Sequence, residues 1–104
     1  MAANDETLTL CCLLWARAGL AADLSAYEDR VLALVGEHGG RVLQRAIGPA
    51  TDEHPNEVQL FVFGSRADLN GYLDDPRRQA LAPERDRVVA RTEVFPVSWR
   101  APSP

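Results

Sequence analysis

Two histidines are the side chains whose ordinary pKa lies closest to neutral pH, so they are the first candidates for acid–base chemistry. His38 could act as a general acid or base. Its position directly before Gly39 equally fits a histidine at a helix end, where the ring satisfies free carbonyl groups and complements the helix dipole. His54 follows Asp52 and Glu53, a trio that could hold a divalent ion but that also fits a solvated acidic turn. We expect no metal site there.

Polar residues inside apolar segments form a second group of candidates. Arg45, Gln59, Arg91 and Glu93 interrupt predicted strands, and a polar group inside a protein or an interface must find a partner or bind something. One interpretation pairs them in salt bridges across a subunit interface. The other assigns an anionic group of a substrate to Arg45 or Arg91, with Tyr27 or Glu93 as the proton-transfer partner.

Aromatic side chains could form the wall of a pocket, because ligand pockets are mostly apolar with a few placed polar groups. They could equally be core or dimer contacts. The aromatic candidates are Trp15, Tyr27, Phe61, Phe63, Tyr72 and Phe95. The predicted catalytic candidates are His38, Tyr27 and Glu93, and the predicted ligand-binding residues are Trp15, Arg45, Gln59, Phe61 and Arg91.

Charge and motifs exclude several classes of function. All eleven basic residues are arginines and the net charge is −4, so without a basic face we expect no nucleic-acid partner. Acidic residues alternate with the densest basic stretch, which predicts a solvated helix surface of paired charges and not a phosphate site. Its arginines are Arg77, Arg78, Arg85 and Arg87. The chain has no glycine-rich phosphate loop, serine elbow or dinucleotide fingerprint, so we expect no nucleotide-dependent chemistry. We expect no cofactor.

The elements that must position these residues follow the order strand, helix, strand, strand, helix, strand. Residues 8–15 are apolar on both faces, which predicts a central strand. An apolar stripe with helical spacing follows; Asp23 or Ser25 could cap this helix, and Gly39 and Gly40 end it.

The second half of the chain repeats this order without repeating the sequence. Strands are predicted at 42–47 and 57–63, and the aliphatic row of the latter is expected to face the helices. The row consists of Val58, Leu60 and Val62. Ser65 and Asp68 form a plausible capping box for the second helix. Pro76 restarts that helix and Pro83 stops or kinks it, before a last strand at 90–97.

Length and composition indicate one ordinary globular domain. The chain has 104 residues, of which 46 % are hydrophobic and 25 % charged. A domain of this size buries only about two thirds of its unfolded surface, so a partner subunit would stabilise it. The apolar run at 8–15 has neither a basic flank nor the length to span a bilayer, so we expect a cytoplasmic protein without a membrane partner. Cys11 and Cys12 point to opposite faces of a strand, and both are expected to be reduced.

Three segments resemble the dimeric α+β barrel superfamily, in particular its small bacterial domains of unknown function. They are HGGRVL at 38–43, FGS at 63–65 and DPRRQALAP at 75–83. The resemblance implies a ferredoxin-like α+β fold, βαββαβ, with a four-stranded antiparallel sheet in the order 4-1-3-2 and helices on one face. In better-known members, which include cofactor-free monooxygenases and isomerases, a cavity between helices and sheet, or inside the barrel, holds the substrate. These segments are structural and carry no catalytic residue.

We therefore expect a single ferredoxin-like domain at 7–97, with flexible segments at 1–6 and 98–104, that forms a homodimer through the sheet face without helices. Two functions remain: a cofactor-free enzyme, monooxygenase-like or isomerase-like, acting on a small apolar or aromatic molecule, and a non-catalytic dimer that binds a ligand or assembles. The enzyme requires a cavity on the order of several hundred Å³ with a titratable side chain in it. A filled barrel interior, with Arg45, Arg91 and Glu93 all paired, would argue against it.

Overall fold

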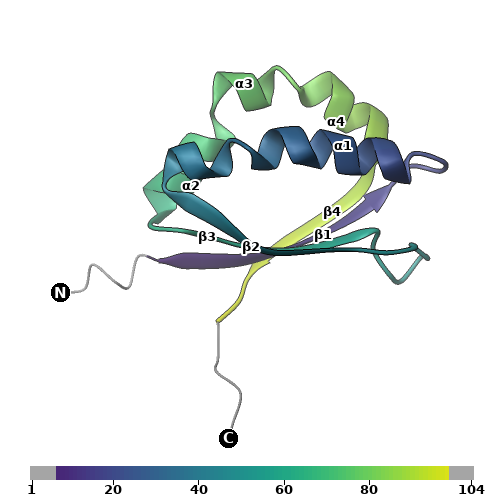
Figure 1. Ribbon diagram of the computed structural model, residues 1–104, viewed down its shortest axis with the longest axis horizontal. Coiled ribbons are helices and arrows are strands. Elements are labelled where there is room, and N and C mark those ends of the chain that lie inside the picture. Colours follow the sequence, from purple (N-terminus) through teal and green to yellow (C-terminus); the bar gives the residue numbers. More distant parts are fainter. Residues whose placement is uncertain (1–6, 99–104) are drawn as a thin grey trace, which may run out of the picture.

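The computed structural model describes residues 7–98, which form an antiparallel sheet with helices on one of its faces (Figure 1). The strand order is β2-β3-β1-β4, so the predicted ferredoxin-like fold with order 4-1-3-2 is confirmed. The elements are β1 (Leu8–Ala16), α1 (Ala21–Leu32), the 3-10 helix η2 (Val35–His38), β2 (Gly40–Ile47), β3 (Glu57–Phe63), α2 (Arg66–Leu73), α3 (Pro76–Gln79), α4 (Ala82–Val88) and β4 (Val89–Pro96). The predicted flexible segment 1–6, and the predicted flexible segment 98–104 apart from residue 98, lie outside the described residues.

Strand β1 is central, as its two apolar rows predict. It pairs with β3 on one side and β4 on the other. Leu10 and Leu14 are buried on the side of the helices, whereas Leu13 lies on the other face of the sheet. Cys12 likewise lies on the helix side and Cys11 on the other face, and both are free thiols.

Strand β3 turns the opposite row toward the helices from the one expected. Directly opposed residues of an antiparallel pair share a face, and β1 places Leu10 opposite Phe61. The helix-facing row is Glu57, Gln59, Phe61 and Phe63, and all four side chains are buried. The expectation that Val58, Leu60 and Val62 face the helices is therefore wrong. The two large rings fill the space under the helices, and partners on α1 and β2 satisfy the two polar residues.

Helix α1 begins without the cap that the sequence suggests. Its first turn follows Leu20, and no side chain caps it. Asp23 instead contacts Arg87, and the Ser25 hydroxyl donates to Glu57, so both are engaged in tertiary contacts. Gly39 ends η2 in the left-handed region at φ 74°, a conformation that favours glycine.

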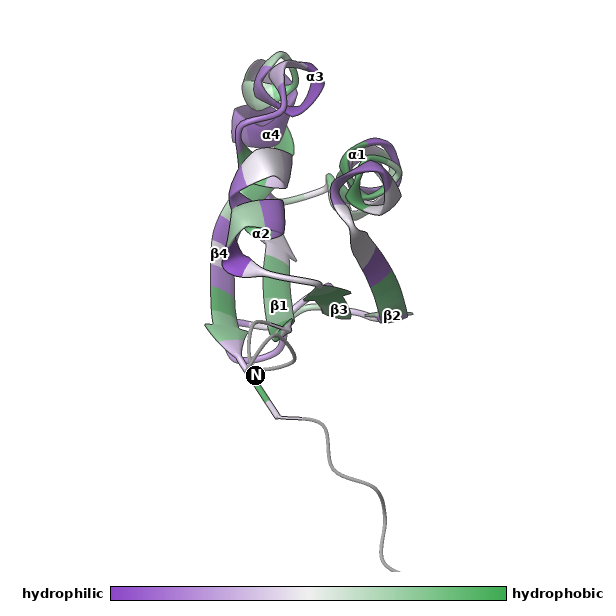
Figure 2. Ribbon diagram, turned by 90° about the vertical axis from the view of Figure 1, so that its left-hand side faces the viewer, coloured by the Kyte–Doolittle hydropathy of each residue, from purple (hydrophilic) through white to green (hydrophobic). Residues whose placement is uncertain are grey.

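The second helical segment consists of three short helices. Ser65 and Asp75 cap α2 and α3 by accepting hydrogen bonds from backbone amides. Pro76 opens α3, as predicted. Pro83 lies in the first turn of α4, so it begins a third helix where a stop or kink was expected. Figure 2 shows this segment beside α1, both on the same side of the sheet. No helix in residues 7–98 is long and apolar enough to cross a membrane.

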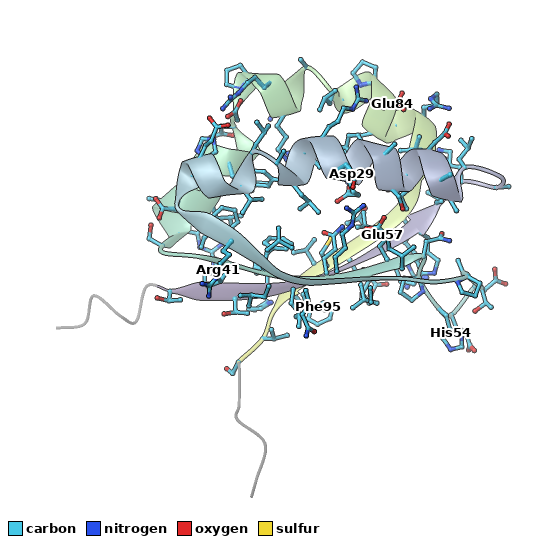
Figure 3. All side chains as sticks on the ribbon, in the orientation of Figure 1. Asp29, Arg41, His54, Glu57, Glu84 and Phe95 are labelled. Atoms are coloured by element: carbon cyan, nitrogen blue, oxygen red, sulfur yellow. The ribbon has the colours of Figure 1, made fainter. Side chains whose placement is uncertain are left out.

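The opposite face of the sheet, here called the open face, has no helix over it within residues 7–98 (Figure 1). It carries Cys11, Leu13, Leu60, Val62 and Phe95. Phe95 is 40 % exposed and points away from the helices (Figure 3). A largely apolar sheet face without a cover is typical of a surface that binds another protein.

Candidate ligand cavity between the helices and the sheet

A cavity of about 360 Å³ lies between the sheet and the helices. Its walls are mostly apolar and include Leu10, Leu14, Val31, Phe61 and Leu69. Val94, on the edge strand β4, lines the cavity and is itself 52 % exposed, so the cavity reaches the surface there. This volume and lining are those of a site for a small organic molecule.

Buried polar groups enter this cavity from α1 and β3. Glu28 is 5 % exposed and Gln59 is 1 % exposed, and both line the cavity beside Tyr27. The Gln59 amide nitrogen Nε2 donates to Glu28 Oε1 at 2.9 Å and to Glu57 Oε1 at 3.0 Å. A single amide therefore joins two buried carboxyl groups.

Glu57 is held as a charged group although it is fully buried. Its carboxylate accepts hydrogen bonds from Arg45 Nε at 2.7 Å and from the Ser25 hydroxyl at 2.6 Å. Burial acts to raise the pKa of Glu57, but the hydrogen bonds from Arg45, Ser25 and Gln59 outweigh it, and the pKa is lowered. Arg45 also pairs with Asp29, which lies above Glu57 on α1 (Figure 3).

A β-bulge in β2 directs Arg45 to this position. Val42 pairs with Phe61 and Arg45 with Gln59, with a register shift between them. Strict alternation from Val42 would turn Arg45 to the open face, whereas the extra residue keeps both on the helix side.

Glu28 has the opposite electrostatic environment. Burial raises the pKa of the Glu28 carboxyl above its ordinary value, and the hydrogen bond from Gln59 offsets only part of this effect. The pKa of Tyr27 is also raised, first by burial and then by the charge of Glu28, so its phenol keeps its proton at neutral pH. Burial raises the pKa of Cys12 to about 12, which leaves a neutral thiol. Two linked carboxyl groups with pKa values shifted apart are the usual arrangement of an acid–base site.

The cavity brings together three of the residues singled out in the sequence, namely Tyr27, Gln59 and Phe61. Arg45 reaches the cavity only through Glu57 and Gln59. His38 lies outside it, with its Nε2 atom 2.8 Å from Asp75 Oδ2 at the end of η2. His38 thus lies at a helix end, as that interpretation expects, but its ring contacts the Asp75 carboxylate where free carbonyl groups were expected.

Three other candidates lie on the open face. The Arg91 guanidinium carbon is 4.2 Å from the centre of the Trp15 ring, and Arg91 also pairs with Glu93. His54 lies in the loop between β2 and β3, at one end of the sheet, and does not line the cavity (Figure 3). Among residues 7–98, no group of three or more histidine, cysteine, aspartate or glutamate side chains is arranged to hold a metal ion.

Glu28 was not among the site residues predicted from the sequence. A signal was present, because Glu28 follows Leu24 by four residues and precedes Val31 by three, which places an acid on the buried stripe of α1. Arg78 and Arg85 also line the cavity, although the alternating charges predicted a solvated, paired surface. That prediction is confirmed for Arg77 and Arg87 and is wrong for these two.

No protein-family profile matches the sequence, and no curated protein matches it significantly. Solved structures match the fold over nearly the whole chain. A protein of unknown function from Rhodopseudomonas palustris has a TM-score of 0.75 at 17 % identity, covering 93 % of this chain and 85 % of that one. SnoaB, a cofactor-independent oxygenase from Streptomyces nogalater, has a TM-score of 0.69 at 15 % identity, with coverage of 95 % and 98 %.

A dimeric protein of unknown function from Bacteroides fragilis, described as having a ferredoxin-like fold, gives a TM-score of 0.68 at 12 % identity. It covers 89 % of this chain and 96 % of its own. Likeness at these identities establishes the fold alone. The chain thus has a ferredoxin-like fold, with a cavity on the helix side of its sheet.

Proposed function

We propose that this protein is a homodimeric cofactor-free enzyme that binds a small apolar or aromatic molecule in the helix-side cavity and moves a proton on it. One observation carries the proposal: the buried carboxyl group of Glu28 lies at the wall of an apolar cavity of about 360 Å³, and Gln59, also at the wall, joins it to the buried Glu57 behind. Their pKa values are shifted in opposite directions, so they are suited to different tasks.

Glu28 is the proton acceptor in this proposal. A carboxylate with a raised pKa is a stronger base than a surface glutamate, and it can take a proton from an acidic C–H or hydroxyl group of the bound molecule. Gln59 orients Glu28 through its hydrogen bond to Oε1, and the charged Glu57 in turn holds the Gln59 amide. The neutral phenol of Tyr27 can donate a hydrogen bond to an oxygen on which negative charge develops.

This proton removal is a first step that an isomerase and a cofactor-free oxygenase can share. In an isomerase the proton returns from Glu28 to another atom of the same molecule, so no further reactant is consumed. An oxygenase consumes dioxygen in addition. The description of SnoaB as a cofactor-independent oxygenase supports this class by analogy of fold only.

A non-catalytic dimer that binds a ligand or assembles is the second candidate. The pairing of Arg45, Arg91 and Glu93 favours it, because none of these side chains is left free for a reacting molecule. In both candidates a second copy of the chain covers the open face; the description of the protein from Bacteroides fragilis as dimeric supports a dimer by analogy. The cytoplasmic location and the absence of nucleic-acid and membrane partners remain predictions from the sequence.

The substitution Glu28→Gln separates the two candidates. The molecule retained by gently purified protein is first identified and then assayed for conversion by mass spectrometry. We expect Glu28→Gln to bind this molecule but to convert it at least about 100-fold more slowly, because the amide cannot accept the proton. The control is Glu53→Gln, a matched change in an exposed loop. Full activity of Glu28→Gln would contradict the enzyme proposal, and binding without any conversion by the wild type would favour the non-catalytic dimer.

A further inference from the structure

Two arginines on neighbouring short helices line the cavity without a carboxylate partner. Arg78 belongs to α3 and Arg85 to α4, and neither forms an ion pair with another residue of the described segment 7–98. The adjacent arginines behave differently. Arg77 pairs with Glu37 and Asp75, and Arg87 pairs with Asp23 and Glu84. The same two helices thus present one paired arginine each to solvent and one unpaired arginine each to the cavity.

Arg78 has unused hydrogen-bonding capacity. Its guanidinium carbon lies 5.0 Å from the centre of the Tyr72 ring, a cation–π contact that fixes the position of the planar group. Its Nε atom is buried and has no hydrogen-bond partner within residues 7–98. A buried donor without an acceptor is unfavourable and calls for a specific explanation.

Arg85 is only weakly engaged. Its terminal nitrogen Nη2 is 3.4 Å from the hydroxyl oxygen of Thr92, which is long for a hydrogen bond. Thr92 lies on β4 and also lines the cavity. The guanidinium group of Arg85 therefore retains donors that an acceptor in the cavity could use.

The charges around the cavity are unbalanced. Among the described residues that line it, Arg66, Arg78 and Arg85 are cationic and Glu28 is the one acidic side chain. Glu28 already accepts a hydrogen bond from Gln59, and burial raises its pKa. An apolar cavity with an excess of positive charge favours an apolar molecule with a negative group.

We infer that the cavity takes a flat apolar molecule that carries one anionic oxygen group, such as a carboxylate, and that Arg78 and Arg85 bind this group. The inference rests on the proposed function, since it names the substrate class of the same cavity. Planar guanidinium groups donate two parallel hydrogen bonds to a carboxylate, so two arginines both select the charge and orient the molecule. The apolar body then lies against Phe61 and the leucines of β1.

A matched pair of fluorescent probes tests this inference. 8-Anilinonaphthalene-1-sulfonate carries an anionic oxygen group, and N-phenyl-1-naphthylamine has the same ring system without it. We expect Arg78→Gln and Arg85→Gln each to weaken binding of the sulfonate at least about tenfold, because a charge-assisted hydrogen bond is lost. Binding of the neutral probe should change less than about twofold, since its contacts are apolar. Arg77→Gln and Arg87→Gln are the matched controls and should affect neither probe.

Binding of the neutral probe also reports whether the cavity of each variant is intact. If Arg78→Gln does not fold, Arg85→Gln alone tests whether an arginine binds the anionic group. An equal loss of both probes in a folded variant would overturn the inference, because the arginines would then only shape the cavity. Sulfonate binding that depends on Arg91 would also overturn it, because the probe would lie on the open face. If neither probe binds to the wild type, the proposed cavity itself fails. If the neutral probe binds and replacement of Arg78 or Arg85 leaves binding of the sulfonate unchanged, the cavity stands and only the assignment of the anionic group to these arginines fails.

Discussion

At the scale of residues, the same amino acid has two opposite roles a few ångströms apart. Glu57 is surrounded by donors that stabilise its charge, and Glu28 has one donor and an apolar environment. The pKa of Glu57 is therefore lowered and that of Glu28 raised, each from the same ordinary value. The charge network of Arg45 stabilises the charged form of Glu57 and does not include Glu28, the residue proposed to accept a proton.

This difference predicts a pH dependence that can be measured as stability. Because the pKa of Glu28 is raised in the folded state, its contribution to stability is fully present below the unfolded pKa of about 4.3 and is lost as pH rises through the folded pKa. Glu28→Gln removes that loss. We expect the free energy of unfolding of Glu28→Gln, relative to the wild type, to increase between pH 4 and pH 8, as measured by urea denaturation.

Glu53→Gln is the control for the pH series, and its difference from the wild type should stay constant. A difference between Glu28→Gln and the wild type that is flat, or that falls as pH rises, would show that Glu28 is not destabilised as a charged group. Its role as the strong base of the cavity would then have no physical basis.

Sequence reasoning at the residue scale found part of the cavity. Tyr27, Gln59 and Phe61 could be predicted as site residues because an aromatic or polar residue is conspicuous in an apolar segment. Glu28 could also have been predicted, since it lies on the apolar stripe of α1. Arg78 and Arg85 could not be predicted as cavity residues, because short helices joined at prolines give no periodicity from which to tell Arg77 from Arg78.

At the scale of elements, one ionic cluster joins α1, β2 and β3. Glu57 of β3 contacts Arg45 of β2, and Arg45 contacts Asp29 and the backbone of Ser25 on α1. This cluster sets the position of α1 over the sheet beside the cavity. Removal of one partner of a buried ion pair is costly because the other charge remains buried.

We therefore expect Glu57→Gln to lower the free energy of unfolding by about 3 kcal/mol at neutral pH. The loss should shrink as pH falls, because the pKa of Glu57 is lowered in the folded state: its contribution to stability is fully present above the unfolded pKa and is lost as pH falls through the folded pKa. Urea denaturation measures both effects. The control Glu53→Gln should cost less than about 0.5 kcal/mol. A loss this small for Glu57→Gln would mean that the cluster does not hold α1 in place.

The order of the elements was predictable, but the faces of two strands were not. Apolar runs and turn residues give the order strand, helix, strand, strand, helix, strand, and the sheet confirms it. The face of β3 was predicted wrongly because both of its rows are largely apolar, and a shift of one residue exchanges them. The bulge that turns Arg45 toward the helices has no marker such as glycine in β2 near residue 43.

At the scale of the whole molecule, the two faces of the sheet have different tasks. The helix side contains the cavity, and the open face presents a largely apolar surface that a second copy of the chain is proposed to cover. Leu60 lies within this surface, on the central part of the sheet between β1 and β2. A charged residue there would have to be buried without a partner if two copies associate, which is strongly unfavourable.

Native mass spectrometry of gently purified protein tests whether the chain forms a homodimer that holds a small molecule. We expect the wild type to have the mass of two chains plus a small molecule, and Leu60→Asp to have the mass of one chain. Exposed Val94 lies on the helix side of the sheet, so Val94→Asp should remain dimeric; because Val94 also lines the cavity, this variant is the control for the dimer mass and not for the bound molecule. A wild-type spectrum that shows bare single chains would contradict both the proposed dimer and the proposed ligand cavity.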